Sequence, residues 1–279
     1  MRSLLLLLLA PVISLAAEVV IVSVYPFYDV VKELSAGRFD TEVLIPPRAD
    51  YHLYELSTRE ILKIHRAKLI FVSGVPLGGW ERKVEALGGD KVVRLAEGLV
   101  VKTEEGIRID PHLWLSPRRM VGVARNAYEA LSEREPESRE LFTKNYKEVL
   151  KKLKELDGEY RNALKSCKFK VLPIIHPALG YLARDYGLKQ LSIGSGDVHG
   201  GVSPKELARF VANIKELGID FIFGIYGVRS KYTDILAEEH GLKVFRINVK
   251  IIPSEHGKDY FSIMRYNLGI LREALRCTY

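Results

Sequence analysis

The feature that most constrains the fold is a repeated alternation of short β-branched segments with amphipathic helical segments. Four segments with strand character fall in each half of the chain: 19–24, 42–46, 68–74 and 91–96, then 170–175, 188–193, 221–226 and 243–249. Between them, Ser57 with Glu60 and Ser203 with Glu206 form capping-box patterns that mark helix starts. Strands that alternate with helices form parallel sheets covered on both faces. The sequence therefore predicts an α/β protein with two small parallel-sheet lobes.

A long amphipathic segment separates the two halves. Its apolar residues recur at alternating spacings of four and three: Phe142, Tyr146, Val149, Leu153, Leu156 and Tyr160. This spacing puts them on one face of a single helix of about 28 residues, roughly 40 Å long. We therefore expect an N-terminal lobe at 18–135, a rigid linking helix at 136–166 and a C-terminal lobe at 167–279, with a cleft between the lobes.

The first residues predict export. The chain starts MRS and continues with the apolar run LLLLLLAPVISLA, which ends in small residues. This run is too short for a stable membrane span, and its last three residues resemble a signal-peptidase site. We expect a signal peptide at 1–17 and a protein located in the periplasm or at the cell surface. An uncleaved N-terminal anchor is the alternative.

Charge patterning limits the classes of partner. The formal net charge is +7, but Lys and Arg are interleaved with Glu and Asp along helical segments, as in KEVLKKLKELDGEYR. This pattern is typical of a solvated helix face. Together with the export signal it argues against nucleic acid as a partner. We expect a monomer.

The chain contains two cysteines, Cys167 and Cys277. In an oxidising compartment an isolated pair forms a disulfide more often than a metal site. A bridge would tie the start of the second half to the end of the chain. Two free thiols that never meet are the alternative.

Three of the seven histidines fall at or near predicted strand-to-helix turns. His52 and His176 each follow a predicted strand, and His112 lies in IDPHLWLSP, just before a helix start with Ser116 as the predicted N-cap. Ligands bind at this edge of α/β sheets. Because the three residues come from both halves, they are candidates for one shared cation in the cleft. For each histidine taken alone, a structural role is the alternative.

The residue types indicate which cation such a site prefers. Three neutral imidazoles suit a borderline ion such as Zn²⁺ better than Ca²⁺ or Mg²⁺. Asp110 is a candidate to hold the second ring nitrogen of His112. Three nitrogens with one open position either bind an ion reversibly or activate water. We therefore predict a Zn²⁺ site, with Mn²⁺ or Fe²⁺ as alternatives.

Five motifs, in order, carry a resemblance to a known family. They are ADYHLYELSTREI, DPHLWLSP, HPALGYLARDYGLKQ, SPKELARFVANIKELGIDFIF and YFSIMRYNLGILREAL. Together they resemble the zinc- and manganese-binding solute-binding proteins of ABC transporters, the ZnuA/TroA-like group. The resemblance covers the whole predicted mature chain. It implies two α/β lobes joined by a rigid helix, with a metal held between them and delivered to a membrane permease.

The same resemblance implies the metal ligands. The family's three histidine ligands match His52, His112 and His176. The histidine at the third ligand position, His176, resembles the pattern of the zinc-type members of the family. The chain departs from the family at the fourth ligand, because Asn248 stands where an aspartate is usual; a glutamate common after an earlier strand is also missing, near Ile225. His199, in the glycine-rich stretch GSGDVHGGVSP, is the alternative fourth ligand.

Two other functions stay open at the level of sequence. One is an extracytoplasmic zinc-dependent hydrolase, for which Glu55, three residues after His52, is the nearest candidate general base. The chain contains neither HExxH nor GxSxG. The other is a diverged family member with an altered metal or ligand, an idea that Asn248 supports. We expect a solute-binding protein and not an enzyme.

Overall fold

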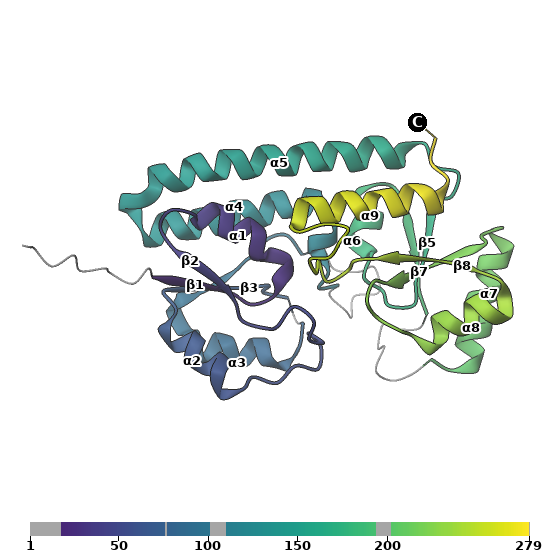
Figure 1. Cartoon of the computed structure of the whole chain (residues 1–279), viewed down its shortest axis with the longest axis horizontal. Coiled ribbons are helices and arrows are strands. Elements are labelled where there is room, and N and C mark those ends of the chain that lie inside the picture. The colour runs from purple at the N-terminus through teal and green to yellow at the C-terminus, as the bar shows by residue number, and fades with distance from the viewer. Residues whose placement is uncertain (1–17, 76, 101–109, 194–201, 279) are drawn as a thin grey trace, which may run out of the picture.

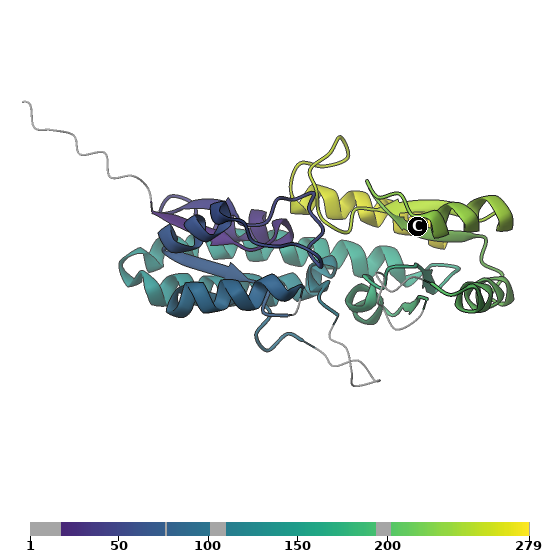
Figure 2. The same cartoon turned by 90° about the horizontal axis from the view of Figure 1, so that it is seen from below.

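The computed structural model describes residues 18–75, 77–100, 110–193 and 202–278. The predicted signal peptide and His199 lie outside the described residues. The described chain forms two α/β lobes placed end to end, with one long helix beside both (Figures 1 and 2). The prediction of two parallel-sheet lobes joined by a helix is confirmed.

The N-terminal lobe is built on a four-stranded parallel sheet with the order β2-β1-β3-β4. Its strands are β1 (Val19–Val22), β2 (Asp40–Val43), β3 (Leu69–Val72) and β4 (Val92–Arg94). The central strands β1 and β3 are almost wholly buried. This burial explains why they read as continuous apolar runs in the sequence, because strands covered on both faces do not alternate.

Helices cover both faces of this sheet. Figure 1 places α1 and α4 on the side of the long helix and α2 and α3 on the opposite side. Their bounds are α1 (Tyr28–Ser35), α2 (Thr58–Arg66), α3 (Gly79–Gly88) and α4 (Pro117–Arg134). The capping box predicted at Ser57 is present at the start of α2.

The C-terminal lobe repeats the pattern with two strand pairs. Its strands are β5 (Val171–Pro173), β6 (Lys189–Leu191), β7 (Phe221–Ile225) and β8 (Lys243–Ile247). β5 pairs with β6 and β7 with β8, all parallel, and a bridge between Ile174 and Phe223 joins the two pairs. Its helices are α6 (Gly180–Asp185), α7 (Pro204–Glu216), α8 (Lys231–His240) and α9 (Tyr260–Leu275).

The linking helix is α5 (Arg139–Lys165), 27 residues long. A short 3-10 turn, Pro136–Ser138, precedes it. Of the predicted apolar stripe, every member is buried except Tyr146, which is half-buried and stacks on Tyr128 with ring centroids 4.6 Å apart. Because α5 packs on α1 and α4 in one lobe and on α9 in the other, it is a shared structural element and not a free tether.

A disulfide joins Cys167 to Cys277, as the sequence suggested. It links the segment just after α5 to the segment just after α9. The bridge therefore fixes the end of the chain against the long helix, at the end of the molecule far from the N-terminal lobe (Figure 1).

The lobes are joined by buried hydrogen bonds as well as by α5. Trp114 Nε1 donates to the Val249 carbonyl at 2.7 Å, and the Tyr260 hydroxyl donates to the Trp114 carbonyl at 2.8 Å. Both aromatic side chains are fully buried. Among the described residues, none of the helices has the length and apolar character needed to cross a membrane.

Ser116 corrects one detail of the prediction. It is the N-cap residue of α4, but its hydroxyl makes no capping hydrogen bond. The hydroxyl instead donates to Asp185 at 2.7 Å, and Arg119 donates twice to the same carboxylate. Asp185 ends α6 in the other lobe, so a residue predicted to start a helix is used to tie the lobes together.

Candidate metal centre

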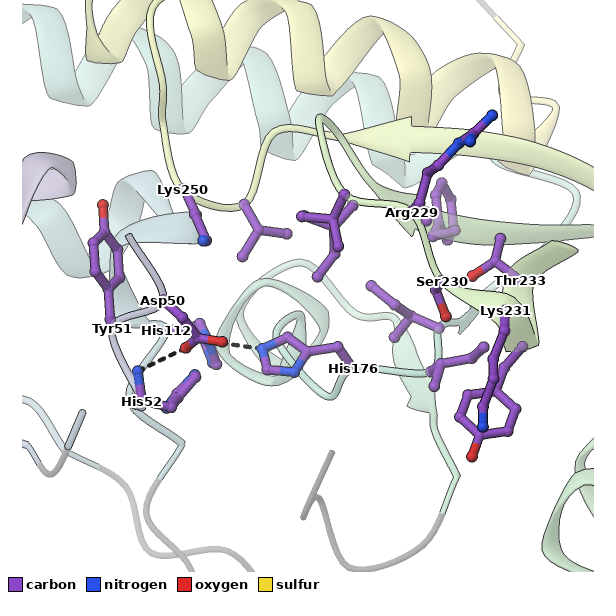
Figure 3. Close-up of a pocket in the computed structure, with 18 of the residues that line it drawn as sticks. Asp50, Tyr51, His52, His112, His176, Arg229, Ser230, Lys231, Thr233 and Lys250 are labelled. Carbon is purple, nitrogen blue, oxygen red and sulfur yellow. Dashed lines mark hydrogen bonds between the residues drawn. The ribbon is translucent and has the colours of Figure 1, made fainter. Parts of the chain in front are cut away.

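Three histidines from three separate segments meet between the lobes (Figure 3). His52 lies in the loop between β2 and α2, His112 precedes the short 3-10 turn Leu113–Leu115, and His176 follows β5. One ring nitrogen of each lies within 4.8 Å of a ring nitrogen of the other two. The ring centroids are 4.9 to 5.8 Å apart. The structure thus brings together all three histidines that the sequence singled out.

Asp110 fixes the orientation of His112. One carboxylate oxygen accepts hydrogen bonds from the His112 backbone N–H and from Nδ1, each at 2.9 Å. Because a carboxylate only accepts, Nδ1 carries the hydrogen and Nε2 presents a lone pair. His112 is only 5 % exposed. The sequence-based assignment of Asp110 as the partner of His112 is confirmed in geometry.

Gly180, the first residue of α6, makes room for that carboxylate. A Cβ atom at this position would lie 2.6 Å from Asp110 Oδ2, closer than real contacts allow. The same Oδ2 is buried without a hydrogen-bond partner among the described residues. The close approach of α6 to Asp110 therefore requires glycine, although the backbone of Gly180 is not left-handed.

Residues of the N-terminal lobe fix the orientation of His52. Its Nδ1 donates to the Leu77 carbonyl at 2.8 Å, since a carbonyl only accepts, and Nε2 is left as the ligand atom. The preceding carbonyl, that of Tyr51, accepts Trp80 Nε1 at 2.6 Å. A Cβ at Gly78 would lie 2.7 Å from that same carbonyl oxygen. The start of α3 thus supports the loop that carries His52.

Glu81 supports His52 indirectly and was missed from the sequence. Its buried carboxylate accepts the backbone N–H groups of Ser73 and Leu77 at 3.1 and 3.2 Å. Burial raises the pKa of Glu81 to about 7, although these hydrogen bonds act to lower it. Nothing in the local sequence separates Glu81 from Glu85 on the same helix, because the partners of Glu81 are backbone groups of a loop.

The third histidine completes the cluster from the C-terminal lobe. His176 Nε2 lies 3.1 Å from His112 Nε2. Because His112 Nδ1 already carries its hydrogen, a neutral His112 turns a bare Nε2 lone pair toward His176. The two rings are nearly perpendicular, with an interplanar angle of 86° and centroids 4.9 Å apart. His176 Nε2–H is then the donor of this hydrogen bond, and a shared cation of the Zn²⁺ type would take the place of that hydrogen between the two ring nitrogens.

The histidines lie at one side of a cavity of about 340 Å³ between the lobes. Its far side is formed by segments at the carboxyl ends of β5, β7 and β8, the edge where ligands bind in α/β sheets. The apolar side chains there include Ile174, Phe223, Ile225 and Val249. Among the described residues, Asp50 is the only carboxylate that lines the cavity.

Asn248, one of the two predicted candidates for the fourth ligand, makes hydrogen bonds within a turn. Its amide nitrogen donates to the Ile252 carbonyl at 2.7 Å, and its amide oxygen accepts the Ile252 N–H at 3.0 Å. Asn248 is 2 % exposed and does not line the cavity. The side chain therefore closes the turn 248–252, in which Ile251 has a φ of 55°. This geometry does not favour the amide as a fourth ligand.

Glu55 and Ile225, which the sequence singled out, and the three other described histidines lie at different places relative to the cavity. Glu55, the candidate base, is exposed and does not line the cavity, whereas Ile225 does. His65 is exposed on α2, and His256 stacks on Tyr266 with centroids 4.3 Å apart. His240 ends α8, and Gly241 follows with φ 66°.

The fold and the cluster define a class: a two-lobe α/β protein with a histidine-lined candidate metal centre between lobes that a long helix joins. A family model described as "Zinc-uptake complex component A periplasmic", ZnuA, matches residues 20–274. The chain belongs to this ZnuA family.

Two curated relatives illustrate the match. The chain is 32 % identical to the zinc-binding protein AdcA of Streptococcus pyogenes, over 91 % of this chain and 55 % of that one. It is 30 % identical to the high-affinity zinc uptake system protein ZnuA of Bacillus subtilis, over 92 % of this chain and 87 % of that one. The chain spans about half the length of the AdcA proteins that it matches.

Solved structures agree on the fold. The metal-dependent lipoprotein YcdH from Bacillus subtilis is similar with a TM-score of 0.79 and 29 % identity, covering 92 % of this chain and 99 % of that one. The Zn(II)-bound ZnuA-like domain of Streptococcus pneumoniae AdcA is similar with a TM-score of 0.79 and 27 % identity, covering 93 % and 99 %.

Proposed function

We propose that this protein is an extracytoplasmic solute-binding protein that captures Zn²⁺ and delivers it to the permease of an ABC transporter. The ligands in this proposal are His52, His112 and His176. The observation that carries it is the convergence of their ring nitrogens within 4.8 Å, from both lobes, in a chain of the ZnuA family.

Zinc is the proposed cargo because the donors are neutral nitrogens. Divalent metal affinity at nitrogen sites rises from Mn²⁺ through Fe²⁺ and is higher for Zn²⁺ than for either. The relatives named above carry zinc in their names, and one similar structure has Zn(II) bound. Mn²⁺ and Fe²⁺ are therefore the weaker competitors in this proposal.

Transport is favoured over hydrolysis by what surrounds the cluster. A zinc hydrolase needs a general base directed at the open coordination position. Glu55 is exposed and outside the cavity. Asp50 is exposed, and its Oδ1 accepts the His52 backbone N–H at 2.9 Å. We further propose that the protein works as a monomer outside the cytoplasm, in line with the periplasmic description of the family.

Equilibrium dialysis with metal analysis tests the proposal. Wild-type protein is dialysed against Zn²⁺, Mn²⁺ and Fe²⁺, the last without oxygen. We expect one tightly bound Zn²⁺ per chain. His52→Ala, His112→Ala and His176→Ala should each lose more affinity than the roughly 10–100-fold that loss of a supporting partner costs. His65→Ala, an exposed histidine on α2, is the matched control and should bind like wild type. Equal losses in the control and the three variants would contradict the proposal.

The fourth ligand remains a prediction with two candidates, Asn248 and His199. The dialysis extends to them directly. A marked loss of zinc affinity in His199→Ala would assign His199. A loss confined to Asn248→Ala, in a variant that unfolds like wild type, would assign the amide despite its hydrogen bonds to Ile252.

A further inference from the structure

The cavity beside the histidines is far larger than a single metal ion requires. Its volume is about 340 Å³, whereas a water molecule in the liquid occupies about 30 Å³. Cavities that hold small organic ligands begin near 300 Å³ and are lined mainly by apolar side chains, with a few placed polar groups. The space therefore matches a metal ion together with a small molecule.

The wall that faces the histidines contains an apolar patch, beside the polar segment 229–233. The patch is formed by four residues that lie in or just after three strands of the C-terminal lobe: Ile174 after β5, Phe223 and Ile225 in β7, and Val249 after β8. All but Ile225 are buried. The patch offers few hydrogen-bond partners to water molecules in the cavity. Contact between the patch and an apolar group of a ligand removes apolar surface from water, which is favourable.

On the side of the cavity that carries the histidines, a bound zinc ion would lack a full counter-charge. Three neutral imidazoles leave the two positive charges of a zinc ion uncompensated, and a partly buried charge without a counter-ion is costly. The one lining carboxylate among the described residues, Asp50, is exposed and accepts the His52 N–H through Oδ1, so it offsets at most one of the two charges.

Lys250 adds to the imbalance and, of the three described lysine and arginine side chains that line the cavity, is the one beside the histidines; the others are Arg229 and Lys231. Lys250 is half-buried, and its nitrogen is directed into the same part of the cavity (Figure 3). One of its N–H groups donates to the Ala49 carbonyl at 2.8 Å. An ammonium has three donors, so Lys250 is suited to hold an anion next to the metal.

We propose that zinc is taken up together with a small organic monocarboxylate. The carboxylate occupies the fourth coordination position and pairs with Lys250, and its apolar body lies against Ile174, Phe223 and Val249. This inference rests on the proposed function, because it places the metal at the three histidines. It assigns to the cavity a substrate class, a zinc–carboxylate complex, in place of the bare ion.

The test measures zinc affinity by dialysis in carboxylate-free buffer, with and without acetate, butyrate, hexanoate or benzoate, corrected for zinc bound by each acid in solution. Apparent zinc affinity should rise with each acid. It should grow about threefold to fourfold per added methylene until the cavity is filled, the ratio that corresponds to about 0.8 kcal/mol per buried methylene. Butanol, which has no carboxylate, should have no effect.

Variants of the protein distinguish the contribution of the carboxylate from that of the apolar body of the ligand. Lys250→Met should reduce the effect of every acid while the dependence on chain length remains. Lys231→Met is the matched control, because the Lys231 nitrogen lies over the Tyr232 ring and away from the histidines (Figure 3). Ile225→Glu places a carboxylate inside the cavity and should make zinc binding independent of added acids.

The outcomes distinguish this inference from the function on which it rests. Tight zinc binding that no acid changes, and that His199→Ala weakens, would overturn the inference and leave the proposed function standing. An equal effect of acetate and benzoate would also overturn it, because no apolar subsite would then exist. Absence of zinc binding under every condition would reject the proposed function itself.

Discussion

The centre depends first on how single residues present their nitrogen lone pairs. Asp110 and the Leu77 carbonyl each accept the Nδ1 hydrogen of one histidine, which leaves Nε2 of His112 and His52 directed at the shared position. Both interactions fix the tautomer before any metal arrives. Such preorganisation raises affinity because less ordering is needed on binding.

Gly180→Ala tests the support of His112 without touching the ligand. The added methyl group would meet Asp110 Oδ2 at 2.6 Å and push the carboxylate off His112. We expect zinc affinity to fall by about 10–100-fold, the usual cost of losing a partner of a metal ligand. Gly158→Ala, in α5 with no atom within 4 Å of the new Cβ, is the matched control. Similar zinc affinities in the two variants, measured by dialysis, would count against the role of Asp110.

Glu81 gives a pH-dependent prediction. Its pKa rises from 4.5 to about 7 on folding, chiefly because of burial. Between about pH 4.5 and 7 the folded protein therefore keeps a proton on Glu81 that the unfolded chain has released. The contribution of the neutral carboxyl group to the free energy of unfolding is complete below about pH 4.5 and is lost as the pH rises through 7. Relative to Glu81→Gln, wild type should lose up to about 3 kcal/mol of unfolding free energy between pH 4.5 and 8.

Urea unfolding of both proteins at several pH values measures this difference. Asp29, whose pKa burial also raises, to about 6, is present in both and cancels. Glu85→Gln, on the same helix but ion-paired with Arg94 and half-exposed, is the control. A difference between wild type and Glu81→Gln that does not change with pH would show that the carboxyl group stays ionised when buried.

At the scale of elements, local sequence patterns predicted those helices and strands that local interactions determine. All eight strands, the capping boxes at Ser57 and Ser203, and α5 follow from hydrophobic periodicity and helix-end chemistry, and each is present. The exceptions depend on distant partners. Ser116 bonds to Asp185, 69 positions away, and such a choice leaves no trace in the local sequence.

The histidine cluster was predictable because its members follow from the topology of the fold. Parallel strands end at one edge of a sheet, so residues just after strands of both lobes are brought to one cleft. Position in the sequence does not by itself identify the fourth ligand. Asn248 stands at the expected place in the sequence, but its amide closes a turn through Ile252, and position in the chain does not reveal which way a side chain points.

The disulfide is the element-scale feature with the most direct test. Cys167→Ser combined with Cys277→Ser releases a loop with a sequence separation of 110 residues. The chain-entropy model gives a loss of about 4–5 kcal/mol in unfolding free energy. We expect zinc affinity to remain unchanged, because the bridge lies beyond the ends of α5 and α9, away from the cavity. Unfolding in urea and zinc dialysis measure the two effects, and an equally stable double serine variant would contradict the first.

For the whole molecule, the contacts between lobes limit how far they can move. Trp114 to Val249, Lys250 to Ala49, and Arg119 to Asp185 are hydrogen bonds between the lobes, and α5 packs on both. A hinge that opened widely would have to break buried hydrogen bonds, each of which is costly to leave unmade. Under the proposed function, we therefore expect metal capture to involve only small adjustments near the cavity.

Small-angle X-ray scattering with and without zinc checks this rigidity. We expect the same radius of gyration in both states within error. Asp185→Asn is an informative comparison, because it weakens the charged contact between α4 and α6. A clear compaction of the wild-type protein on adding zinc would show hinge closure and contradict the expectation.

The central claim is that His52, His112 and His176 bind one zinc ion together. Zinc K-edge X-ray absorption on the zinc-loaded protein tests it most directly. The claim predicts three imidazole nitrogens at about 2.0–2.1 Å, with one further nitrogen or oxygen ligand, and a loss of one imidazole in His112→Ala. A spectrum with fewer than three imidazoles in the wild-type protein, or one that His112→Ala leaves unchanged, would contradict it.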